Sequence, residues 1–131
     1  MHAYADRAVS LVIYAKDAQA VAAFYVSALQ LSRESDDGDA VLLGNRHLAL
    51  VIVQAPPDAR ARIVLASPPR RRAETPLKPS FLVPDLAAAR TAIVAAGGGL
   101  APENEPWLWR GAWHLDGWDP EGNVFQLRQA R

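Results

Sequence analysis

The chain has 131 residues, half of them hydrophobic and 21% charged, which is the composition of one folded domain and not of a disordered chain. Its 14 basic and 14 acidic residues cancel, so no net charge attracts nucleic acid or an anionic membrane. The absence of cysteine excludes disulfides, thiolate metal sites and cysteine nucleophiles. We expect a cytoplasmic protein with neither a signal peptide nor a membrane span, because the longest apolar stretch is too short to cross a bilayer.

The first half of the chain predicts one strand, one helix and three further strands. Residues 9–15 are apolar and β-branched and have the length of a strand, and Asp17 is a suitable N-cap for the helix that follows. The buried face of that helix is marked by apolar residues at helical spacing: Val21, Phe24, Tyr25, Ala28 and Leu29. The three later strands are predicted at residues 31–35, 40–43 and 47–53.

The second half repeats this order of elements. Proline and arginine dominate residues 67–79, which disfavours regular structure there. A strand at 80–83, a capping Asp85 and an alanine-rich helix that ends before Gly97 then follow. We therefore predict a single domain over residues 1–131, with module one at 8–54, a linker at 55–77 and module two at 78–129.

Two short motifs carry a family resemblance. Residues 24–31, Phe-Tyr-Val-Ser-Ala-Leu-Gln-Leu, resemble the pattern F-Y-x-x-x-L-G-L, except that Gln30 replaces the glycine, and residues 119–123 form the pattern D-P-x-G-N. At this spacing the chain resembles the vicinal oxygen chelate superfamily of glyoxalases, bleomycin resistance proteins and extradiol dioxygenases. The resemblance implies an α+β fold in which two tandem βαβββ modules form an open, cupped mixed sheet, paired in a homodimer.

The resemblance also implies where a divalent metal is held in members that use one. Mapped through the motifs, those positions are Ser10, Leu48, Lys78 and Gln126. Leucine has no donor atom and a protonated lysine repels a cation, so only Gln126 is a suitable ligand. We expect no metal cofactor. The alternative is a divalent metal in another register, because a shift of one residue exchanges Leu48 for His47.

Three residues near the C-terminal end alternate along one predicted strand: His114, Asp116 and Trp118. Alternation places them on one face, and the resemblance implies that this face lines the cavity, opposite Gln126. His114 and Asp116 are the candidate catalytic residues, with the carboxylate orienting the imidazole as an acid or base. The other interpretation is a hydrogen-bonded pair with a structural role in a half-buried strand.

The four tryptophans lie between residues 107 and 118, a density that suits stacking on a planar ligand or packing in a core or interface. We interpret Trp113 as packing. The predicted ligand-binding residues are Trp109, Trp118, Gln126, Lys78, Ser10, Tyr14 and Leu48. The excess of acidic residues in the C-terminal third suggests an acidic rim and hence a planar cationic ligand; they are Glu103, Glu105, Asp116, Asp119 and Glu121.

Three functions remain open from the sequence. The leading hypothesis is a metal-independent small-molecule binding protein that resembles the bleomycin-resistance proteins, which confer antibiotic resistance by sequestering a drug. The alternative is an enzyme of the same superfamily, such as a lyase, isomerase or dioxygenase, that uses His114 and Asp116 or a metal in another register. A third is a dimerisation module with a collapsed cleft.

Overall fold

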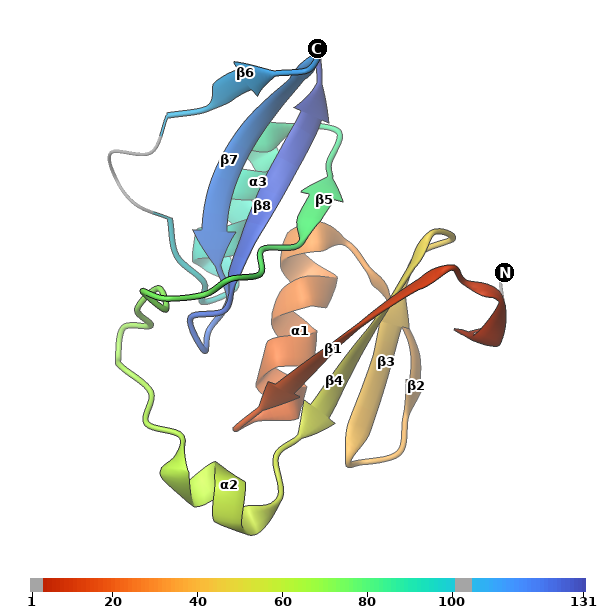
Figure 1. Ribbon diagram of the computed structural model, residues 1–131, viewed down its shortest axis with the longest axis vertical. Helices are drawn as coiled ribbons and strands as arrows, with labels where there is room; N and C mark the ends of the chain where they lie inside the picture. Colours follow the sequence, from red (N-terminus) through yellow and green to blue (C-terminus); the bar gives the residue numbers. More distant parts are fainter. Residues whose placement is uncertain (1–3, 101–104) are drawn as a thin grey trace.

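The computed structural model describes residues 4–100 and 105–131 and contains two four-stranded mixed sheets (Figure 1). A single 3-10 turn, Tyr4–Asp6, precedes the first strand. The first half comprises β1 (Val9–Ala15), α1 (Ala18–Leu29), β2 (Ser32–Asp36), β3 (Ala40–Gly44), β4 (Leu48–Gln54) and α2 (Pro57–Arg62). The second half comprises β5 (Ser80–Leu82), α3 (Leu86–Ala95), β6 (Trp107–Trp109), β7 (Ala112–Trp118) and β8 (Val124–Ala130).

The strand order is the same in both halves. It is β1-β4-β3-β2 in the first sheet and β5-β8-β7-β6 in the second. In each sheet the first strand pairs in parallel with the last, and the other pairs are antiparallel. The predicted α+β fold of two βαβββ modules is therefore confirmed. No helix among the described residues is long and apolar enough to span a membrane.

One short helix was not predicted. Helix α2 lies where the sequence suggested only a linker, and it has a proline in its first turn. Asp58 in the first turn and Arg60 and Arg62 in the last match the helix dipole. Between α2 and β5 the described chain has no further helix or strand, as the proline and arginine content predicted.

The two modules begin their helices with the same pair of caps. In each, an aspartate before the helix and a glutamine from the last strand accept hydrogen bonds from the free N–H groups of the first turn. In module one these bonds are Ala20 N to Asp17 Oδ1 (3.1 Å) and Ala18 N to Gln54 Oε1 (2.9 Å). In module two they are Ala87 N to Asp85 Oδ1 (2.9 Å) and Leu86 N to Gln129 Oε1 (2.7 Å).

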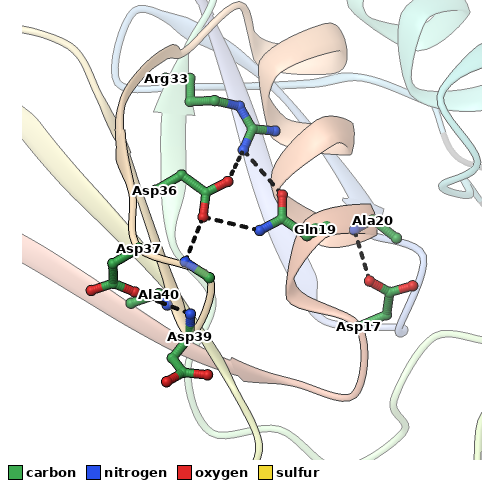
Figure 2. Close-up of polar contacts among 9 residues, drawn as sticks. Asp17, Gln19, Ala20, Arg33, Asp36, Asp37, Asp39 and Ala40 are labelled. Atoms are coloured by element: carbon green, nitrogen blue, oxygen red, sulfur yellow. Dashed lines mark hydrogen bonds and ion pairs between the residues drawn. The ribbon is translucent and has the colours of Figure 1, made fainter.

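Polar contacts join α1 to the β2–β3 hairpin (Figure 2). Gln19 of α1 donates from Nε2 to Asp36 Oδ1 (3.2 Å) and accepts from Arg33 Nη1 (3.3 Å). Asp37 closes the turn, because its Oδ1 accepts from the backbone N–H groups of Asp39 (3.0 Å) and Ala40 (2.8 Å). The aspartates of this turn therefore serve its geometry.

A single core joins the two modules, because α1 lies between the sheets (Figure 1). The ring of Tyr25 on α1 lies 6.3 Å from that of Phe81 on β5, and the ring of Phe24 lies 6.0 Å from that of Phe125 on β8. Tyr25 also donates its hydroxyl to Asp119 Oδ2 (2.9 Å) in the turn before β8. Each sheet thus turns one face toward this shared core and the other face away from it.

The D-P-x-G-N turn fastens module two to module one. The Glu121 carboxylate accepts hydrogen bonds from the backbone N–H groups of Lys16 (2.8 Å) and Asp17 (2.9 Å), just before α1. The linker is held on the same turn, because Arg72 N donates to the carbonyl of Gly122 (3.0 Å). This motif therefore has a structural role as the joint between the modules.

Candidate ligand-binding site

The outer face of the second sheet gathers the predicted site residues of module two. In the β6–β7–β8 register Trp107 pairs with His114, His114 with Arg128, and Asp116 with Gln126. Because Leu115 and the other alternate residues of these strands are buried in the core, His114 and its partners lie on the opposite face. We call this surface the outer face of sheet two.

An aromatic group lies on this face. The imidazole of His114 stacks on the indole of Trp107, with ring centroids 5.5 Å apart and planes 16° apart, and Trp109 meets it edge-on at 5.9 Å. His114 is only 3% exposed, whereas Trp107 and Trp109 are 41% and 59% exposed. The sequence analysis did not include Trp107 among the ligand-binding residues, although it lies two residues before Trp109 on the same strand and therefore on the same face. The face therefore offers two exposed indoles beside a buried imidazole.

Polar side chains extend the aromatic group toward β5. Lys78 donates from Nζ to Asp116 Oδ2 (3.0 Å), and this ammonium lies 5.9 Å from the centroid of the Trp107 ring. Ser80 donates to Gln126 Oε1 (2.8 Å) and accepts from Arg128 Nε (2.8 Å). Lys78, Asp116 and Gln126 thus come together as the sequence analysis expected.

The hydrogen bond expected between His114 and Asp116 is not formed. Asp116 pairs with Lys78 instead, and Nδ1 of His114 is buried without a hydrogen bond to any described residue. The imidazole is positioned by its stacking on Trp107, which no spacing in the sequence predicted. The geometry thus shows no carboxylate orienting Nδ1 of this histidine.

Trp118 has a different environment from Trp109. Its indole lies against the backbone of Gly99, in the space that a β-carbon at that position would occupy, and its Nε1 donates to the carbonyl of Pro69 (3.3 Å). The ring therefore fastens the linker to the end of β7. This arrangement favours the packing interpretation for Trp118, while Trp113 lies on the other face of the strand, paired with Leu108.

The first sheet has an outer face too, and it carries Ser10, Val12 and Tyr14 of β1. The register pairs Ser10 with Ala49, whereas Leu48 pairs with Val9 and packs against the core. The prediction that Leu48 shares a face with Ser10 is therefore wrong. The two Gly-Asn turns are therefore not equivalent starting points for counting along the last strand of each module, and Ala49 and Val51 of β4 lie on the outer face.

His47 does not replace the missing ligand. It is exposed in the turn before β4, where its N–H and that of Leu48 both donate to Asn45 Oδ1 (2.9 and 3.0 Å). The mapped positions that the structure keeps on the outer faces are Ser10, Lys78 and Gln126, and Ala49 and Val51, the outer-face residues of β4 beside Ser10, have no donor atom. This set has one amide, one hydroxyl and an ammonium that already binds Asp116, and these do not fit a divalent cation. The described residues contain no group of three acidic or histidine side chains that could hold a metal.

Two of the carboxylates that the sequence analysis expected at an acidic rim are instead buried and bonded within the protein. Asp119 is fully buried, and burial raises its pKa although hydrogen bonds from Asn123, Glu121 and Tyr25 act in the opposite direction. Burial, and then the neighbouring Asp119, raise the pKa of Tyr25 well above its ordinary value. Glu121 is buried at the joint between the modules, and Asp116 is paired with Lys78. Glu105 is exposed before β6, and Glu103 lies outside the described residues.

Two βαβββ modules with open outer faces define the class of glyoxalase and bleomycin-resistance folds. A glyoxalase-like domain model matches residues 10–128. The chain belongs to this glyoxalase-like family. No curated protein sequence matches it.

Solved structures show the same fold at low sequence identity. A glyoxalase/bleomycin resistance protein/dioxygenase family enzyme from Burkholderia phytofirmans is 17% identical, with a TM-score of 0.70 over 93% of this chain and 97% of that one. A protein of unknown function from Agrobacterium tumefaciens is 22% identical, with a TM-score of 0.67 over 95% and 94%. A fosfomycin resistance protein from Listeria monocytogenes, complexed with Mn(II), is 13% identical, with a TM-score of 0.64 over 94% and 87%.

Proposed function

We propose that this protein binds a small planar molecule without a metal ion, on the outer face of sheet two. The observation that carries the proposal is the aromatic group of Trp107, Trp109 and His114, which presents exposed indoles next to a polar row. Indoles stack on flat rings, and a few fixed polar groups orient a ligand. The donor set at the family's metal positions supports the metal-free part of the proposal.

A second copy of the chain completes the site in this proposal. Within one chain the two outer faces point away from the common core, and β1 and β5 are edge strands of separate sheets. Their exposed apolar side chains include Tyr14 on β1 (67%) and Leu82 on β5 (65%). Pairing β1 of one chain with β5 of another covers these edges and encloses the aromatic group between two faces.

Binding of a neutral planar probe tests the proposal. We expect 2-naphthalenemethanol to bind the purified protein in calorimetry and Trp109→Ala to weaken binding about tenfold, because stacking on an aromatic ring is worth roughly 1–1.5 kcal/mol. Trp113→Ala is the matched control, since it removes an exposed indole from the opposite face. Equal loss in both variants, or no binding of planar probes by the wild type, contradicts the proposal.

Metal analysis tests whether ligand binding is independent of a metal ion. Protein purified without chelator should contain far less than one equivalent of divalent metal, and adding Mn(II) or Zn(II) should leave probe affinity unchanged. Stoichiometric metal that EDTA removes, with loss of probe binding, contradicts metal-independent binding.

The second candidate is a metal-free enzyme of the same family, and the buried Nδ1 of His114 is the observation that favours it. An imidazole nitrogen without a partner among the described residues can exchange a proton with a bound molecule once a neighbouring side chain moves and exposes it. Mass spectrometry of a bound ligand after long incubation separates the two functions. Recovery of unchanged ligand supports a binding protein, and conversion that His114→Ala abolishes at retained affinity supports the enzyme.

A further inference from the structure

A guanidinium on the outer face of sheet two forms no ion pair with the residues that the structure describes. Arg128 on β8 is half-buried, and its hydrogen bonds to described residues go to the neutral oxygens of Ser80, from Nε to Oγ (2.8 Å) and from Nη2 to the carbonyl (3.5 Å). Ion pairs in the described part of the chain involve Arg7, Arg33 and Lys78 but not Arg128. Partial burial of a charge without a counterion is unfavourable, so this cation is available to an anion.

The imidazole of His114 lies next to it. His114 is the register partner of Arg128 across β7 and β8, and it is 3% exposed with Nδ1 unbonded. Buried polar atoms without a partner are rare in folded proteins, and a ligand can bond this nitrogen only if a neighbouring side chain moves aside. The Arg128 guanidinium and this imidazole thus adjoin the exposed indoles of Trp107 and Trp109.

The other charges on this face also favour an anion. Asp116 is neutralised by Lys78 at 3.0 Å, so its carboxylate is balanced by a cation of the protein. The guanidinium of Arg110, in the β6–β7 turn, lies 4.9 Å from the centroid of the Trp109 ring and adds positive charge beside that indole. A cationic ligand stacked on Trp109 would meet Arg110 and Arg128.

We propose that the ligand of this face is a planar aromatic carboxylate. Its ring stacks on Trp109 and Trp107, and its carboxylate binds the free side of the Arg128 guanidinium, next to His114. The planar guanidinium matches the two oxygens of a carboxylate and forms paired, charge-assisted hydrogen bonds with them. The proposal rests on the proposed function, and it replaces the cationic ligand that the sequence suggested.

Three probes that share the naphthalene ring but differ in charge test which ligand charge the site prefers. We expect the full-length protein to bind 2-naphthoate about tenfold more tightly than 2-naphthalenemethanol in calorimetry, and to bind 2-naphthylmethylammonium more weakly than the alcohol. Because the ring is constant, the differences report the charge of the substituent. Raising the salt concentration should weaken the naphthoate alone.

The variant Arg128→Gln tests whether Arg128 is the residue that binds the carboxylate. Glutamine keeps a hydrogen-bond donor near Ser80 but has no charge, so the variant should lose about tenfold in naphthoate affinity and clearly less in affinity for the alcohol. Arg90→Gln is the matched control, because Arg90 lies on α3, near Trp113 on the other side of the sheet. Thermal unfolding of each variant checks that it is folded.

The outcomes separate the two proposals. If the ammonium probe binds as tightly as naphthoate or more tightly, or if Arg128→Gln and Arg90→Gln change naphthoate affinity equally, the aromatic carboxylate is wrong while planar binding stands. If none of the three probes binds the wild type, planar binding itself is overturned. The wild-type probe series decides the question even when a variant fails to fold.

Discussion

At the scale of single residues, the most consequential polar contact is the one between Tyr25 and Asp119. Both side chains are almost fully buried, and the phenol donates to a carboxylate whose pKa is raised by burial. Tyr25→Phe should destabilise the protein by about 1–3 kcal/mol, because it removes a hydrogen bond to a charged buried group. Chemical denaturation measures this change.

The cost of Tyr25→Phe should depend on pH. A carboxyl with a raised pKa in the folded state keeps a proton that the unfolded chain releases, so its stabilising effect is present at low pH and is lost as pH rises through the folded pKa. The Tyr25 hydrogen bond lowers the pKa of Asp119, and its removal makes ionisation costlier still. We therefore expect a larger cost at pH 7 than at pH 4. Tyr4→Phe, at an exposed tyrosine, is the control, and a pH-independent cost contradicts the assigned role.

At the scale of elements, the helix caps are the features that the sequence predicted most directly. Asp85→Ala removes the acceptor of the N–H groups of Ala87 and Ala88, and it should cost about 1 kcal/mol, or roughly 3–5 °C in Tm. Asp58→Ala should cost much less, because the short helix α2 has Pro56 at its N-cap position and no side-chain cap. Equal Tm losses in the two variants would show that the cap is not the cause.

What the sequence could predict follows from how local each signal is. The caps and the strand alternation depend on neighbouring residues, so the modules and the shared face of His114 and Asp116 could be predicted. The His114–Trp107 stacking and the Lys78–Asp116 pair depend on how strands meet, and spacing along one strand does not report this. Leu48 was misplaced because the Gly-Asn motif is not followed by the same number of residues in the two modules, and an odd error in register moves a side chain to the other face of the sheet.

At the scale of the whole molecule, the position of α1 decides what one chain can bind. Because this helix and the common core separate the two sheets, the face with Tyr14 and the face with Trp109 belong to different sides of one chain. In the proposed homodimer each site therefore takes one face from each copy. Sedimentation should accordingly give twice the mass of the 14.2 kDa chain.

Mixed dimers test this sharing of the site. Tyr14→Ala and Trp109→Ala homodimers should each bind planar probes poorly, because both of their sites carry the defect. When the two variants are unfolded and refolded together, half of the dimers that form at random are mixed. In each mixed dimer, the wild-type Tyr14 face of one chain and the wild-type Trp109 face of the other form one intact site. About a quarter of all sites should then regain wild-type affinity. Recovery measured by calorimetry supports a site shared between copies, whereas a mixture no better than its components places the whole site on one chain.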